Sequence, residues 1–350
     1  MSTPYASEVF VHRLLGKALA AGASDVHLKV GQPPGARVRG DIVYFRGDKI
    51  LAQDTLGAAR LLLGGAVDAR LEAAQEIVFA YEAAGIGRFR VTAYRQRGAF
   101  GLVMRALPLQ IPTLAELGVP AAATALAEKR SGIVIVAGGS SVGKSSTVAA
   151  MIGHLNDSYA RHIVTLEDPI ELVHEDHRGS VSQREIGADT ASFAVGLRAA
   201  LRQDPDVVAV SELGDHDTFE AALDAAERGH LVIAVVPAPD AVHAVGRLLA
   251  LGRGLHDLAP RLAAALEGVL AQRFAPKRDG TGMALTCEVL VATAAVREAL
   301  RAPDGDDLGA RLRELMERGA TPYGMQTFEM AYKQLAAQGV TSASIRPPPP

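Results

Sequence analysis

One stretch near the middle of the chain limits what the whole sequence can fold into. Residues 132–139, GIVIVAGG, form an uninterrupted apolar run that ends in glycine, as a buried strand of an α/β sheet does. The next residues keep glycine, lysine and serine at the spacing G-x-x-x-x-G-K-[ST], and the helix-forming sequence STVAAMIGHL follows. Strand, glycine-bearing loop and helix in this order predict an α/β sheet with a phosphate-binding loop at one strand end.

Each residue type in this loop has a defined task in phosphate binding. We expect the backbone N–H groups of the loop and the start of the helix to point at the phosphates. The Lys144 ammonium would neutralise the β and γ oxygens, and the Ser145 hydroxyl would ligate Mg²⁺. ATP and Mg²⁺ are therefore the predicted ligands. The predicted nucleotide-binding residues of the loop are Gly138, Gly139, Ser140, Ser141, Val142, Gly143, Lys144, Ser145 and Ser146.

Two further apolar strands end in carboxylates. IVTLEDPIELVHE places Glu167, Asp168 and Glu171 at the end of one strand, and DPDVVAVSELGD ends the other in Glu212. Open α/β sheets have their ligand crevices at the carboxyl ends of the strands. An ATPase needs an acid on the Mg²⁺ side and a carboxylate that orients or deprotonates water. We expect these strand ends to supply both, with Glu167 among the nucleotide-binding residues. Each acid taken alone could equally be a solvated strand end.

A proline-rich stretch divides the chain. LPLQIPTLAELGVP holds three prolines, which interrupt regular structure and suit a linker. Before it, helical and alternating patterns predict a small α+β domain; after it, strands alternate with helices, which predicts a mostly parallel, doubly wound sheet. Helical sequence is expected from 241 to about 272 and again over 293–337, with VLAQRFAPKRDGTGMALTCEVLVA, residues 269–292, predicted as a hairpin between them. The predicted boundaries are 1–106 for the first domain, 107–120 for the linker, 121–346 for the second domain and 347–350 for a flexible proline tail.

Charge and composition argue against several classes of protein. Thirty-six basic and 39 acidic residues give a net charge of −3, so nucleic-acid binding through a basic surface is not expected. The single cysteine, Cys287, cannot form an intrachain disulfide or a thiolate metal cluster, and a reducing cytoplasm fits this usage. No apolar run reaches about 18 residues. We therefore expect a soluble protein that reaches a membrane only through a partner.

Segments along almost the whole chain resemble one family. SDVHL, GRFRVTAY, the glycine-rich loop, VTLEDPIELVH, LRQDPDVVAV, AAERGHLV and YGMQTFEMA are similar, in order, to segments of the type IV pilus retraction ATPases, PilT and its paralogue PilU, of the secretion-ATPase superfamily. The resemblance implies a PAS-like N-terminal domain and a RecA-like P-loop ATPase domain with a helical C-terminal region. It also implies a hexameric, cytoplasmic motor that acts on an inner-membrane platform protein, retracts a pilus and so supports twitching motility.

The resemblance assigns roles to particular residues. Glu171 corresponds to the base that activates water, and Glu212 to the Walker B glutamate, here also a predicted Mg²⁺ ligand. His230 corresponds to the first histidine of the family's His box, which is thought to sense the phosphates. Arg90 and Arg105, on neighbouring predicted strands, are similar to the pair that reaches the γ-phosphate across domains or subunits. A planar guanidinium suits that task because it grips phosphate and stays charged.

Three departures from the family pattern surround the same site. Ser141 takes the place of a glycine, Pro237 stands where a second histidine is expected, and SELGD has Ser211 and Gly214 in place of glycine and arginine. They leave open a second interpretation: a weakly catalytic subunit that binds nucleotide and regulates, or co-assembles with, a retraction ATPase. A secretion-system ring ATPase is a third, less favoured interpretation, because those motors commonly carry a four-cysteine zinc site.

Overall fold

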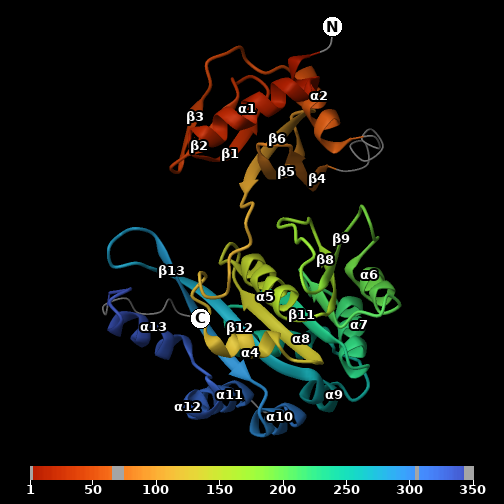
Figure 1. Cartoon of the computed structure of the whole chain (residues 1–350), viewed down its shortest axis with the longest axis vertical. Coiled ribbons are helices and arrows are strands. Elements are labelled where there is room, and N and C mark those ends of the chain that lie inside the picture. The colour runs from red at the N-terminus through yellow and green to blue at the C-terminus, as the bar shows by residue number, and fades with distance from the viewer. Residues whose placement is uncertain (1–2, 65–74, 304–306, 343–350) are drawn as a thin grey trace. The chain divides into compact units, whose positions relative to one another are not determined.

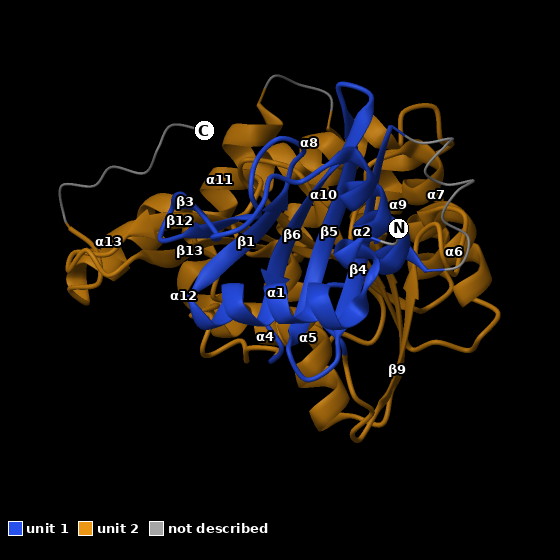
Figure 2. Cartoon of the chain, turned by 90° about the horizontal axis from the view of Figure 1, so that it is seen from above, with its two compact units in different colours: residues 1–110, 168–173 blue, residues 111–167, 174–350 orange. Residues whose placement is uncertain are grey.

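The computed structural model describes residues 3–64, 75–303 and 307–342. The chain forms two compact units, one of residues 1–110 with 168–173 and one of residues 111–167 with 174–350 (Figure 2). The short segment 168–173 therefore belongs to unit 1, although unit 2 flanks it on both sides in the sequence. The predicted proline tail, 347–350, lies outside the described residues, and the predicted linker bounds stay a prediction.

Unit 1 is built on a six-stranded antiparallel sheet in the order β3-β2-β1-β6-β5-β4. Its elements are η1 (Pro4–Ala6), α1 (Glu8–Ala20), β1 (Ala23–Leu28), β2 (Gly35–Val38), β3 (Asp41–Tyr44), α2 (Ala52–Leu63), β4 (Glu76–Ala83), β5 (Gly87–Gln96) and β6 (Ala99–Leu107). Alternation along β5 buries Phe89 and Val91 in the core of this unit and leaves Arg88 and Arg90 on the other face. The predicted α+β fold is confirmed.

Unit 2 is built on a seven-stranded sheet in the order β13-β12-β7-β11-β10-β8-β9. All neighbouring strands run parallel except the β12–β13 hairpin. Its elements are α4 (Ala121–Ala127), β7 (Gly132–Gly138), α5 (Lys144–Ser158), β8 (His162–Glu167), β9 (Ser180–Glu185), α6 (Phe193–Ala200), β10 (Val207–Val210), α7 (His216–Glu227), β11 (Leu231–Val236), α8 (Ala241–Leu251), α9 (Leu258–Ala265), β12 (Leu266–Pro276), β13 (Met283–Val291), α10 (Ala294–Arg301), α11 (Leu308–Arg318), α12 (Ala320–Tyr323) and α13 (Phe328–Ala337). The predicted doubly wound α/β sheet is confirmed.

Helices cover both faces of this sheet (Figure 1). On β7, Ile133 and Ile135 pack in the core that α6 to α11 and α13 share, whereas Val134 and Val136 pack in the core beneath α4 and α5. A strand that is buried on both sides reads as a continuous apolar run, which is why β7 is so clear in the sequence. None of the helices in the described ranges has both the length and the apolar character needed to cross a bilayer.

One strand and one strand boundary differ from the expectation. β9 was not predicted, because SVSQRE is a polar edge strand that pairs with β8 alone and is nowhere fully buried. The predicted hairpin over 269–292 is confirmed as β12 and β13, but the helical pattern expected up to about residue 272 ends at Ala265, and β12 begins at Leu266. β12 lies between β7 and β13, and burial between two strands overrides the helical character of LEGVLAQ.

Candidate active site

The carboxyl ends of the parallel strands of unit 2 bring part of the predicted site together at one edge of the sheet. The glycine-rich loop follows β7, and α5 begins at Lys144 directly after it. Glu212 lies two residues past the end of β10, and β11 is the strand between β7 and β10. The loop and the acid that follows β10 therefore lie at the same edge, one strand apart.

Backbone geometry shows which loop positions require glycine. A Cβ on Gly138 would lie 2.6 Å from Val142 Cγ2 and 2.8 Å from the carbonyl oxygen of Gln272, so no larger residue fits. Gly143 caps α5 with a φ of +86°, in the left-handed region that glycine enters without a steric penalty. Ser141 has a φ of +61°, also left-handed, where a β-carbon costs about 1–2 kcal/mol. Replacement of glycine at this position therefore introduces backbone strain in the loop.

Lys144 and Glu212 form the electrostatic centre of the site. The Lys144 ammonium donates a hydrogen bond to the Gly139 carbonyl and so curls over the loop. Burial lowers the pKa of Lys144, and the nearby negative charge of Glu212 acts in the opposite direction. Glu212 is exposed, as is Ser145 in the first turn of α5. A cation, a carboxylate and a hydroxyl thus converge beside the N-terminus of a helix, where anions are stabilised.

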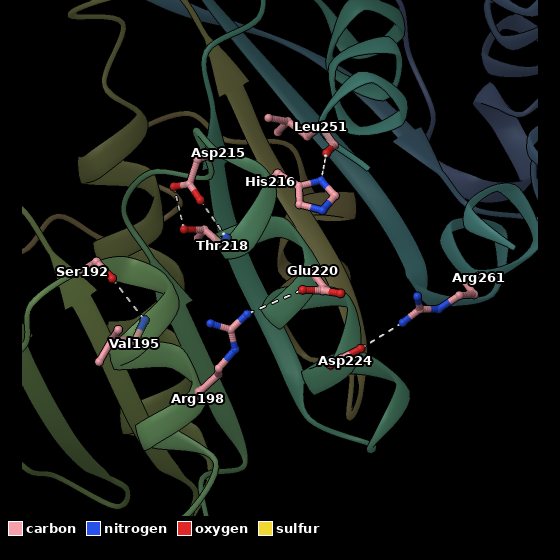
Figure 3. A network of polar contacts seen from close by, with 10 residues as sticks. All are labelled: Ser192, Val195, Arg198, Asp215, His216, Thr218, Glu220, Asp224, Leu251 and Arg261. Atoms are coloured by element: carbon pink, nitrogen blue, oxygen red, sulfur yellow. Dashed lines mark hydrogen bonds and ion pairs between the residues drawn. The ribbon is translucent and has the colours of Figure 1, made fainter. Parts of the chain in front are cut away.

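A network of polar contacts holds α7, the helix that begins four residues after Glu212 (Figure 3). Three residues after Glu212, Asp215 caps α7 by accepting hydrogen bonds from the backbone N–H of Thr218 (2.9 Å) and from its hydroxyl (2.7 Å). Ion pairs then join α7 to α6 and to the first turn of α9. The helix that follows Glu212 is therefore capped at its start and tied to α6 and α9 along its length.

Gln272 on β12 supports the loop from beneath and is a residue that the sequence analysis misses. It is fully buried, pairs with Gly138 across the β7–β12 ladder, and donates a 2.7 Å hydrogen bond to the Thr147 hydroxyl on α5. This bond ties the first turns of α5 to the strand beside the loop. The available signal was a glutamine inside an apolar strand, since buried polar side chains almost always have a partner.

The remaining predicted residues of unit 2 lie at different positions along the sheet. Glu167 ends β8, at the same edge as the loop but two strands beyond β11, and accepts hydrogen bonds from Thr165 (2.6 Å) and Gln183 (2.8 Å). Pro237, which stands where a second histidine is expected, directly follows β11 and thus lies at the carboxyl edge, between the strands that lead to the loop and to Glu212.

His230 does not join the loop. It precedes β11, whose first residue, Leu231, pairs with Gly132 at the start of β7. The six residues of β11 span roughly 20 Å, so His230 lies at the opposite edge of the sheet from the loop in the same chain. Its Nδ1 lies 2.8 Å from the carbonyl oxygen of Pro205. Contact between His230 and phosphates bound to the loop of its own chain is therefore ruled out.

Unit 1 holds the predicted arginines and the predicted base. Arg90 on β5 and Arg105 on β6 lie directly opposite each other in the antiparallel ladder. Arg90 Nη1 is 3.1 Å from Glu171 Oε1, and Arg105 Nε is 2.9 Å from Asp25 Oδ1. Burial alone would raise the pKa of Asp25, but hydrogen bonds from Ser24 and Arg105 bring it below its ordinary value. The two adjacent positive charges are thus each neutralised by a carboxylate, Arg90 by Glu171 and Arg105 by Asp25.

Backbone contacts hold the segment that carries Glu171. Arg88, on the same face of β5 as Arg90, donates hydrogen bonds from Nε (3.1 Å) and Nη2 (2.7 Å) to the carbonyl oxygen of Ile170. This forked contact fixes the backbone next to Glu171, so the pairing of Glu171 with Arg90 does not depend on two flexible side chains alone.

Comparison with known proteins agrees with this arrangement. Residues 5–302 match the family described as Type II/IV secretion system protein. The chain belongs to this family. It is 34% identical over 334 residues to the type IV pilus retraction ATPase PilT of Pseudomonas aeruginosa, and the aligned residues make up 95% of each chain. It is 36% identical over 333 residues to the type IV pilus ATPase PilU of the same organism, covering 93% of this chain and 85% of PilU.

A solved structure supports the same family assignment. The crystal structure of the pilus retraction motor PilT with bound ADP superposes with a TM-score of 0.85 at 34% identity, covering 95% of this chain and 94% of that chain. The resemblance seen in the sequence is therefore confirmed. The chain is an ATPase of the type II/IV secretion family with a PilT-like fold.

The donor set at the loop fits Mg²⁺ shared with phosphate groups. Mg²⁺ is commonly held by one or two protein oxygens together with substrate phosphates and water. The Ser145 hydroxyl and the Glu212 carboxylate are oxygen donors of this kind. Across the described ranges, no group of three or more histidine, cysteine, aspartate or glutamate side chains could hold a metal ion.

Proposed function

We propose that the chain is a ring-forming motor that hydrolyses ATP to ADP and phosphate and uses the energy to retract a type IV pilus. The observation that carries this proposal is the placement of Lys144 beside Glu212 at the end of a glycine-rich loop, in a chain that matches PilT over 95% of its length. In P-loop ATPases a lysine of the loop contacts the phosphates and a strand-end acid lies on the Mg²⁺ side.

Nucleotide binding rests on unit 2. The N–H groups of the loop and of the first turn of α5 would surround the β-phosphate, and Lys144 would turn from the Gly139 carbonyl to the β and γ oxygens. Mg²⁺, held by Ser145 and Glu212, supplies charge neutralisation to the phosphates when it is bound. Glu167, already held by Thr165 and Gln183, would contribute to the nucleotide site from the end of β8.

Hydrolysis would require residues of unit 1. Glu171 would accept the proton of the attacking water, and Arg90 and Arg105 would stabilise the charge on the γ-phosphate. The Arg90–Glu171 ion pair must open first, because the guanidinium occupies the carboxylate oxygen Oε1 that would otherwise face water. Arg105 likewise must leave Asp25. Formation of the active arrangement would therefore break two ion pairs within unit 1.

The assembly and partners follow from the same proposal. We propose a hexameric ring in the cytoplasm, bound to an inner-membrane platform protein of the pilus machine. Similarity to PilT, a pilus retraction motor, supports this assembly. The ring could consist of this chain alone or include a related retraction ATPase.

One observation favours a second candidate, a weakly catalytic regulatory subunit. Pro237 directly follows β11, between the strands that lead to the loop and to Glu212, and proline offers no side-chain donor to a phosphate. The strained backbone at Ser141 lies in the same site. Both features are compatible with slow turnover and preserved binding.

Gene replacement in the source organism tests the proposal. A strain that lacks the chain should assemble pili that do not retract, and the wild-type gene should restore retraction. A gene that encodes Lys144→Ala should fail to restore it, because the variant loses the charge that holds the phosphates. Full restoration of retraction by Lys144→Ala would contradict the proposed motor function and favour the role of a regulatory subunit.

A further inference from the structure

One strand beside the loop extends well past it. Of the two neighbours of β7, β11 ends level with the loop, with Val236 opposite Ala137, whereas β12 runs on beyond the pairing of Gln272 with Gly138. Residues 273–276 of β12 therefore continue for about 13 Å past the last paired residue of β7. They pair with β13 on their other side and form a rigid wall along one flank of the loop.

The alternation of side chains along β12 decides which of residues 273–276 face the loop. Gln272 points toward α5, because it bonds to Thr147 on that helix. Alternation along a strand puts Phe274 on the same face and Arg273 on the other. Arg273 confirms the alternation, since it donates to the Pro239 carbonyl and covers the Phe328 ring of α13.

Phe274 reaches the start of α5. A Cβ built on Gly143 would lie 3.8 Å from Phe274 Cζ, so the phenyl ring lies next to the bare backbone at the N-cap of α5. The residue remains 37% exposed. Single exposed apolar residues are common on protein surfaces. The position of Phe274, on a rigid strand at the rim of a phosphate-binding loop, sets it apart from such a scattered residue.

We propose that the phenyl ring of Phe274 is the stacking platform for the base of the bound nucleotide. The inference rests on the proposed binding of ATP at the loop. When the β-phosphate lies at the start of α5, the ribose and base extend outward from the loop, and β12 is the neighbouring strand that continues in that direction. The exposed ring offers a flat apolar surface that a base would cover. Stacking uses the π-face that every base presents, so the platform favours purine nucleotides without selecting adenine over guanine.

The test compares ligands with and without a base. Binding of ATP, GTP and inorganic tripolyphosphate, each with Mg²⁺, is measured by titration calorimetry on the full chain and on Phe274→Leu. Leucine keeps the strand apolar opposite Leu285 but removes the ring. We expect the dissociation constants for ATP and GTP to rise about tenfold and that for tripolyphosphate to stay within about twofold.

Two further variants serve as controls. Phe274→Tyr should bind like the wild type, because it keeps an aromatic face. Tyr323→Leu should also bind like the wild type, since it removes an aromatic side chain of similar exposure, 54%, on α12.

The outcomes distinguish failure of the stacking role from failure of the proposed nucleotide binding. Unchanged ATP affinity in Phe274→Leu, or an equal loss of affinity for tripolyphosphate, would overturn the stacking role and leave nucleotide binding intact. Failure of the wild-type chain to bind any of the three ligands would overturn both.

Discussion

Arg90 Nη1 lies 3.1 Å from Glu171 Oε1, so the arginine that we propose for the γ-phosphate holds the carboxylate that we propose as the base. Side-chain exposures of 43% and 27% place this pair at the surface of unit 1, where it can exchange partners at modest cost. In this conformation the two groups neutralise each other. Activation would then consist of replacing Glu171 by the γ-phosphate as the partner of Arg90.

This relationship predicts the effect of Arg90→Gln. We expect turnover to fall about 100-fold or more, because the charge that stabilises the transition state is lost, while the affinity for ATP changes less than about threefold. Steady-state kinetics and equilibrium binding measure the two effects. Arg46→Gln, which removes an exposed arginine of the same unit, should change neither. A loss of affinity that equals the loss of turnover would contradict the assignment.

Ser141→Gly should relieve strain in the phosphate-binding loop. The φ of +61° at Ser141 is unfavourable for a residue with a β-carbon, so we expect glycine to be neutral or to stabilise unit 2 by up to about 1 kcal/mol. Ser140→Gly is the matched control. It should destabilise by about 0.5–1 kcal/mol, since Ser140 is not among the residues with positive φ. Urea unfolding gives both values, and equal effects of the two substitutions would argue against strain at Ser141.

The Gln272–Thr147 hydrogen bond should couple β12 to α5 energetically. Gln272→Leu leaves the Thr147 hydroxyl buried without its donor, which costs about 1–3 kcal/mol. Addition of Thr147→Val should recover part of that loss, because both polar partners are then gone. A double-mutant cycle by urea unfolding measures the coupling. Strictly additive losses would show that the bond contributes nothing to stability.

His174 predicts a pH dependence of stability. Burial lowers its pKa from 6.5 to about 4, an effect larger than the opposing charge of Asp157. The folded chain therefore keeps His174 neutral, while the unfolded chain takes up a proton as the pH falls below about 6.5. Stability from this residue is complete above pH 6.5 and declines toward pH 4, by up to roughly 3 kcal/mol.

Two histidine variants isolate this contribution. His174→Asn should flatten the decline in unfolding free energy between pH 6.5 and 4. His256→Asn should keep it, since the His256 side chain is 92% exposed. An unchanged pH profile in His174→Asn would refute the role of His174.

Local sequence predicted the structure correctly where a residue pattern suits only one backbone conformation. The apolar run of β7, the glycines at 138 and 143 and the lysine at 144 predict a strand, a tight loop and a helix start because only those conformations suit them. The opposition of Arg90 and Arg105 was also accessible, since strands separated by a short turn pair as neighbours.

Contacts that depend on tertiary structure were not accessible. Nothing near Glu171 in the sequence indicates that it pairs with Arg90, 81 residues away. The position of His230 at the far edge of the sheet depends on the direction of β11, which periodicity does not report. The hairpin that carries Phe274 was predicted, but the start of β12 was obscured because a buried strand rich in alanine and leucine resembles a helix until its neighbours are known. The position of Phe274 beside the loop was not accessible for the same reason.

The steady-state rate of phosphate release from ATP by the purified chain tests the central claim most directly. It is measured with Mg²⁺, for the wild type and for Lys144→Ala, with and without a retraction ATPase from the same source. We predict that the wild type alone hydrolyses ATP and that Lys144→Ala reduces the rate to background. Equal background rates for both proteins, with ATP binding intact in the wild type, would contradict a motor and leave the regulatory subunit.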